Sequence, residues 1–139
     1  MPRMRVLLAA TLLAITCVLA SCASPGGPGI TDSRALGVPE GVQLGGPTEG
    51  PFVVAYDDGS VDVVTQGSGS CPPTASAIEI EADLLVVTFE PSTNDVCTAD
   101  IAPTTHSFSA DRVGGDVPDT ARIIYSSEDA PIDVDVIRG

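Results

Sequence analysis

The sequence predicts an all-β fold, a small β-sandwich or open barrel of about seven short antiparallel strands with one disulfide. No window repeats its apolar residues at helical spacing, and short apolar or alternating segments instead recur along the chain. Glycine, proline and aspartate separate these segments, as turns require. All five aromatic residues lie after residue 51, which indicates one modest core over residues 51–139.

The clearest hairpin joins Phe52–Tyr56 to Val61–Thr65. The turn between them, Asp57 to Ser60, contains an Asp-Gly step, which favours a tight hairpin. The next strand, Ala77–Glu81, alternates, so that Ile78 and Ile80 are expected to face inward.

A short turn at Ala82-Asp83 leads into Leu84–Phe89. This run is apolar on both faces, which predicts a central strand covered on both sides. Three further strands complete the set: Thr104–Ser109, Arg122–Ser126 and Ile132–Val136. The last alternates, with its aspartates pointing outward.

The chain opens with features of a signal peptide. Arg3 and Arg5 precede an uncharged run, Val6–Leu19, and small residues follow it. At 1.5 Å per residue the run spans about 21 Å, which is less than the ~30 Å hydrocarbon core of a membrane. Cleavage is therefore the preferred interpretation, and an uncleaved anchor or ordinary secretion are the alternatives.

The end of this run, Leu19-Ala20-Ser21-Cys22, resembles the bacterial lipobox. The resemblance implies that residues 1–21 are removed and that Cys22 becomes a diacylated N-terminus. The protein would then be a lipoprotein held at the cell membrane, on its extracytoplasmic face.

Residues 22–50 are rich in glycine and proline, and their apolar residues show no period. We expect this segment to be a tether that carries an acidic β-domain, residues 51–139. Removing Arg3 and Arg5 with the signal changes the formal charge from −13 to −15. Such a charge makes nucleic acids and anionic lipid headgroups poor partners. It is interpreted mainly as a source of solubility.

Two cysteines remain in the predicted domain. Cys17 would leave with the signal and Cys22 would carry lipid, so Cys71 and Cys97 form an even pair in an oxidising compartment. We expect them to form a disulfide that closes a loop of about 26 residues, worth roughly 3 kcal/mol. A zinc site is the alternative, but neither cysteine has a second Cys or His close by in sequence.

The segments Gly67 to Pro73 and Cys97 to Pro103 are similar to a pattern in small, β-rich lipoproteins of GC-rich Gram-positive bacteria. In those proteins two cysteines bracket a β-hairpin. The resemblance implies a lipid-tethered β-domain of unknown activity, and it carries no active site over to this chain.

Three patterns suggest chemistry. His106, the only histidine, lies near Ser107 and Ser109, but no nucleophile motif accompanies it, so a surface position is expected. Gly67 to Ser70 resembles a phosphate loop, but no positive charge or following helix is visible. A flexible approach to Cys71 is the preferred interpretation.

Aspartates form the remaining candidate sites. Asp57, Asp58 and Asp62 surround Gly59, and calcium prefers such oxygen ligands, although the EF-hand pattern is absent. A hairpin turn with solvated carboxylates explains the same residues. The same two interpretations apply to Glu128 and Asp129 with Asp133 and Asp135.

The sequence thus predicts a lipid-anchored, non-catalytic binding module of the cell envelope with no cofactor. Its partner is expected to be a protein or an envelope component. The alternatives are a calcium-binding module and, ranked last, an envelope hydrolase centred on His106.

Overall fold

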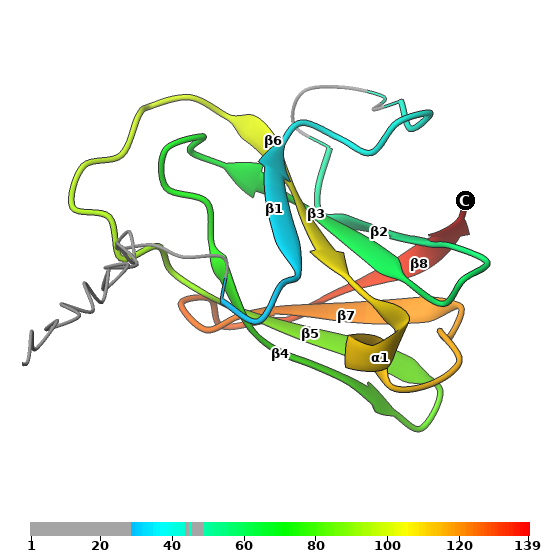
Figure 1. Cartoon of the computed structure of the whole chain (residues 1–139). Coiled ribbons are helices and arrows are strands. Elements are labelled where there is room, and N and C mark those ends of the chain that lie inside the picture. Colours follow the sequence, from blue (N-terminus) through cyan, green and yellow to red (C-terminus); the bar gives the residue numbers. More distant parts are fainter. Residues whose placement is uncertain (1–28, 44, 46–48) are drawn as a thin grey trace, which may run out of the picture.

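The computed structural model describes residues 29–43, 45 and 49–139. These residues form one curled, eight-stranded mixed sheet, a half-barrel, in the order β1-β6-β3-β2-β8-β7-β5-β4 (Figure 1). The strands are β1 (Ser33–Leu36), β2 (Phe52–Ala55), β3 (Val61–Gly67), β4 (Thr74–Glu81), β5 (Leu84–Glu90), β6 (Ala102–Phe108), β7 (Thr120–Tyr125) and β8 (Ile132–Arg138). The predicted signal, the lipobox and Cys22 lie outside the described residues.

The all-β prediction is confirmed, with two corrections. There are eight strands rather than about seven, and the sheet is mixed rather than antiparallel, because β2 pairs with β8 and β5 pairs with β7 in parallel. Each parallel pair joins strands that are separated in sequence by other elements. Parallel neighbours need such crossovers, and no turn motif announces them.

The two local hairpins form where the sequence places them. In the β2–β3 turn the Gly59 N–H donates to the Tyr56 carbonyl at 2.9 Å, and Gly59 adopts a φ of 82°. The β4–β5 turn consists of Ala82 and Asp83, and Ala82 has a φ of 53°. A positive φ is unusual for a residue with a Cβ. In this turn Ala82 therefore adopts a backbone conformation that glycine would adopt at lower cost.

Strand β8 is the corner at which the sheet changes direction. Its first half pairs with β7 in antiparallel register, and its last three residues pair with β2 in parallel register. Ile132 therefore lies opposite Ile123, whereas Val136 lies opposite Val53. Because alternate residues face one side, Ile132, Val134 and Val136 all point into the concave face. The curl of the sheet encloses the core on this face.

The core is continuous across the concave face. Its buried members come from seven strands and from the short helix α1 (Ala110–Val113): Val53, Ala55, Val61, Val63, Ala75, Leu85, Val87, Phe89, Phe108, Val113, Ala121, Ile123 and Val136. Helix α1 packs against β4, and Ile80 of that strand packs against the same core. The helix ends at Gly114, which takes the left-handed conformation that terminates helices. This helix closes one end of the half-barrel. No helix among the described residues is both long enough and apolar enough to cross a membrane.

The predicted tether is wrong for residues 29–43. Ser33–Leu36 form the edge strand β1, which pairs antiparallel with β6. Before it, Gly29 forms a bridge with Ala75 of β4, and Thr31 is 6% exposed. After it, Glu40 to Gln43 line a groove with Val54 on the convex face. The composition of this segment does not reveal that it belongs to the sheet. Backbone pairing with distant strands holds it in place, and its apolar residues show no repeat.

Candidate functional site at the mouth of the half-barrel

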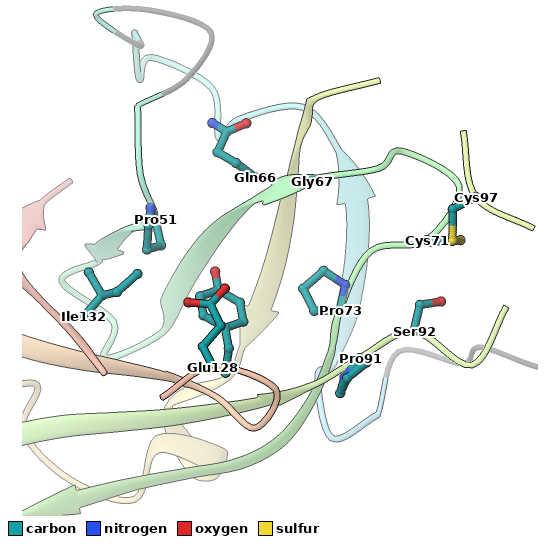
Figure 2. A pocket seen from close by; sticks show the side chains of 11 residues that line it. Pro51, Gln66, Gly67, Cys71, Pro73, Pro91, Ser92, Cys97, Glu128 and Ile132 are labelled. Carbon is teal, nitrogen blue, oxygen red and sulfur yellow. A yellow bond between two sulfur atoms is a disulfide. The ribbon is translucent and has the colours of Figure 1, made fainter. Parts of the chain in front are cut away.

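A cavity of about 480 Å³ occupies the end of the half-barrel opposite α1 (Figure 2). We call it the mouth cavity. Nearly every residue that lines it stands at the end of a strand or in the loop beyond. These residues are Pro51, Gln66, Gly67, Cys71, Pro73, Pro91, Ser92, Cys97, Tyr125, Glu128 and Ile132. Barrel mouths are common places for ligand sites, and this volume lies in the ~300–1,000 Å³ range of small-molecule pockets.

Three prolines determine where the walls of the mouth cavity end. Pro51 directly precedes β2, Pro73 directly precedes β4, and Pro91 directly follows β5. Proline has no N–H for the sheet ladder, so strand pairing stops beside it. Its ring also presents carbon atoms to the opening. The mouth cavity therefore has apolar walls, with few backbone donors from these positions.

Packed aromatic rings close the inner end of the mouth cavity. The Tyr125 ring centroid lies 5.8 Å from that of Phe89, which in turn lies 4.8 Å from the His106 ring. Phe89 and His106 are fully buried, whereas Tyr125 is partly exposed and lines the cavity. Only Tyr125 of the three can meet a ligand. Burial, and secondarily the nearby Glu128 carboxylate, raise the pKa of Tyr125 to about 12, so its phenol stays neutral at physiological pH.

The rim of the mouth cavity is cross-linked, and the predicted disulfide is confirmed. Cys71 and Cys97 are bonded, with their Cα atoms 5.4 Å apart. Hydrogen bonds join the same two loops: the Asn94 side chain donates to the Ser70 carbonyl at 2.6 Å, and the Thr98 N–H donates to the Ser70 hydroxyl at 2.8 Å. Because these contacts bridge distant parts of the chain, the rim is organised before any ligand arrives.

Few polar groups face the mouth cavity. The Glu128 carboxylate has no hydrogen bond or ion pair with any described residue, and its side chain is exposed. The Ser92 hydroxyl accepts a bond from the Asn94 N–H. The amide of Gln66 is buried without a partner among the described residues, but it points away from Glu128 and from the proline walls (Figure 2). Glu128 is thus the charged side chain that remains open to a ligand.

The surface position predicted for His106 is wrong. Its side chain is fully buried, Nε2 lies 3.0 Å from the Thr65 hydroxyl, and Nδ1 has no partner among the described residues. Burial, and to a lesser extent the charge of Arg34, lower its pKa to about 4, so the ring is neutral at physiological pH. The polar sequence around it concealed an inward position, since alternation along β6 points Thr104, His106 and Phe108 into the concave face.

The sequence also placed aspartates at a possible calcium site. The structure gives two of them roles within the hairpin: Asp58 accepts from the Ser60 N–H at 2.9 Å, and Asp62 accepts from the Tyr56 hydroxyl at 2.8 Å. Asp57 is exposed. Among the described residues no group of three or more Asp, Glu, His or Cys side chains is placed to hold a metal ion.

The second acidic candidate is divided by the fold. Asp133 accepts two bonds from Arg122 at 2.7 Å on the convex face, where Asp135 is aligned with Thr120. Glu128 instead lines the mouth cavity. The four carboxylates of Glu128, Asp129, Asp133 and Asp135 therefore do not act as one set.

The glycine–serine segment before Cys71 lies in the rim. The Ser68 and Ser70 hydroxyls bond to the Thr98 hydroxyl at 3.0 and 3.1 Å, and the Gly69 N–H donates to the Asp100 carboxylate at 3.2 Å. A carboxylate already occupies the place that a phosphate would take, and strand β4 rather than a helix follows. These contacts organise the rim.

Comparisons of the chain with protein families, with curated proteins and with solved structures found no match. The candidate site therefore depends on geometry alone. Sequence reasoning missed the mouth cavity and named Glu128 only as part of an acidic cation site, although the three prolines at strand boundaries were a visible signal. The meaning of those prolines depends on the strand order, which brings positions 51, 73 and 91 to one end.

Proposed function

We propose that this protein is a lipid-anchored, extracytoplasmic binding module of the bacterial cell envelope, without catalytic activity, and that the mouth cavity is its ligand site. The observation that carries the binding role is the combination of apolar walls, a cross-linked rim and one open carboxylate in a preformed cavity. A preformed cavity lowers the entropic cost of binding, because the loops around it are already ordered.

The absence of catalysis is proposed on the placement of the titratable groups. Acyl or phosphoryl transfer needs a base within hydrogen-bonding reach of a nucleophile and an open site beside both. The His106 imidazole is fully buried, and the Phe89 ring packs against it. Within the mouth cavity, Tyr125 and Glu128 are the titratable side chains, since Cys71 and Cys97 are bonded to each other.

The anchor is proposed from the lipobox resemblance, and the fold adds a consequence for it. Gly29 is held to the domain at Ala75, so seven residue steps separate it from Cys22. At ~3.3–3.6 Å per step, the spacer reaches about 25 Å at most. The domain would therefore stay close to the headgroups.

Metabolic labelling with an alkyne fatty acid tests the anchor. We expect label on the wild-type chain and on Cys17→Ala, the matched control, but not on Cys22→Ala, which should retain residues 1–21. Equal labelling of Cys22→Ala would contradict the anchor.

Site-specific photocrosslinking on intact cells tests the binding role. A photoreactive side chain at Ser92, on the rim, is expected to give a discrete adduct. The same group at Asp135, on the convex face, should give none. Identical adducts from both positions would argue against the mouth cavity as the ligand site.

A further inference from the structure

We infer that the mouth cavity receives a lysine or arginine side chain of a partner protein, with the cationic group between the Tyr125 ring and the Glu128 carboxylate and the stem against the proline walls. This inference deepens the proposed binding function and rests on it. Four observations carry it: the carboxylate without a partner among the described residues, the partly exposed ring, the apolar walls and the charge of the chain.

The carboxylate is the first observation. Three of the described arginines form ion pairs elsewhere: Arg112 with Asp32, Arg122 with Asp133 and Arg138 with Asp119. Glu128 has no such partner among residues 29–43, 45 and 49–139, and no arginine of these ranges lines the mouth cavity. The chain contains no lysine. The part of the chain that the structure describes therefore places no cation beside Glu128.

The ring is the second observation. Tyr125 lines the mouth cavity, and the face of a tyrosine ring carries the negative quadrupole that attracts ammonium and guanidinium groups. Glu128 follows Tyr125 by three residues, and its N–H donates to the Tyr125 carbonyl at 2.9 Å. This turn brings the two residues together, and, besides burial, the Glu128 charge lies near enough to help raise the pKa of the Tyr125 phenol. A ring and a carboxylate at one opening together favour a cation.

The walls are the third observation. Lysine and arginine bury their methylene stems against apolar surface while the charged end stays near water. Pro51, Pro73, Pro91 and Ile132 provide such surface around the opening. A free inorganic cation would use none of it. The cavity is therefore better suited to a cation on a carbon stem than to a metal ion.

Charge is the fourth observation. The formal charge of the chain is −13, because it has nineteen acidic and six basic residues. A field of this sign concentrates cationic partners and repels anionic ones, which speeds their encounter. An anionic ligand would have to approach Glu128 with no compensating cation among the lining residues.

Peptide titration tests the inference with the full chain, purified in a non-ionic detergent. The probes are three acetylated, amidated tripeptides, Gly-X-Gly, in which X is lysine, arginine or norleucine. Norleucine keeps the apolar stem and lacks the charge. Binding is followed by amide chemical shifts in NMR spectra.

We expect the lysine and arginine peptides to shift amides at the mouth cavity, such as those of Gly67 and Tyr125. The norleucine peptide should bind about three- to thirtyfold more weakly, the range given by one exposed cation–ring contact and one exposed ion pair. Glu128→Gln should remove the share of this difference that comes from the ion pair, about half of it. Glu79→Gln is the matched control, since it changes the net charge equally on a strand outside the cavity. It should preserve the difference.

Three outcomes would overturn the inference: equal affinity for the norleucine peptide, equal losses in Glu128→Gln and Glu79→Gln, or the absence of shifts at the mouth cavity. The first would indicate a purely apolar ligand, and the second would indicate attraction to the general charge. None of these outcomes depends on Cys22, so failure here is distinct from failure of the anchor. Conversely, a chain that is not lipidated could still bind the peptides.

Discussion

Gly29 meets Ala75 across the gap between the two edges of the sheet. The Ile30 N–H donates to the Ala75 carbonyl of β4 at 3.1 Å, so the segment that leads into β1 reaches β4. Strands β1 and β4 are the first and last in the sheet order. One bridge therefore begins to close the half-barrel at this point. A Cβ on Gly29 would lie 2.2 Å from the Ala75 carbonyl oxygen, and the φ of Gly29 is 67°. Glycine is required here on both counts.

Gly29→Ala is expected to destabilise the fold by about 1–3 kcal/mol, because the methyl group must displace backbone and φ is positive. The measurement is the urea midpoint, followed by circular dichroism. Gly41→Ala is the control: its φ is 83°, but nothing lies within 4 Å of the added Cβ. Gly41→Ala should lower the free energy of unfolding only by the cost of placing a residue with a Cβ at a positive φ, about 1 kcal/mol. Equal losses in the two variants would refute the close contact.

Ala82→Gly is expected to stabilise the domain by up to about 1 kcal/mol. Ala82 holds a φ of 53° in the β4–β5 turn, a conformation that costs a residue with a Cβ energy and costs glycine little. The entropy that glycine adds to the unfolded chain offsets part of the gain. Urea midpoints measure the change. A lower midpoint for Ala82→Gly would contradict the strained turn.

Arg34 provides a test of the domain boundary. It lies in β1, paired with His106 of β6, and is the only trypsin site between residues 29 and 43. We expect the bond after Arg34 to resist trypsin in the native protein, because a protease needs an extended segment free of sheet pairing. Mass spectrometry of the fragments reports the cut, and the urea-unfolded chain serves as control. Rapid cleavage after Arg34 would contradict the pairing of β1 and support a tether over these residues.

Stability is expected to fall as the pH drops from 7 to 5, in part through His106. Its folded pKa is about 4, below the ordinary value of 6.5, so between these values the unfolded chain binds a proton that the folded chain does not. The contribution of His106 to the free energy of unfolding is complete above about pH 6.5. Below that it decreases by ~1.4 kcal/mol per pH unit, which amounts to about 2 kcal/mol by pH 5. Urea titrations at both pH values measure it. The side chain of the His106→Gln variant cannot titrate, so its free energy of unfolding should decrease less between pH 7 and pH 5. A decrease equal to that of the wild-type protein would show that His106 does not cause the pH dependence.

Replacing both Cys71 and Cys97 with serine is expected to lower the free energy of unfolding by about 3 kcal/mol. The bond spans 26 residues, and in the chain-entropy model its loss restores freedom to the unfolded chain. Thermal melting of the variant, compared with the reduced wild-type protein, measures the effect. The two should melt at similar temperatures. A variant as stable as the oxidised protein would contradict this account.

Local patterns in the sequence were sufficient to place the strands after residue 51, but they did not predict the short helix α1. The Asp-Gly turn, the alternation around Ile78 and the apolar run of β5 are signals that act between neighbours, and each corresponds to an element of the fold. The disulfide could likewise be predicted from the sequence, because Cys71 and Cys97 are the two cysteines of the predicted domain and neither has a second Cys or His close by in sequence.

Only the tertiary structure determined β1, the buried His106 and the mouth cavity. Ser33–Leu36 become a strand because β6 offers an unpaired edge, and His106 turns inward because of its register with β3. The strand order then brings Pro51, Pro73 and Pro91 to one end beside Glu128. Each of these results depends on backbone pairing between distant segments. Such pairing uses groups that every residue carries, and so leaves little trace in the side chains of either partner.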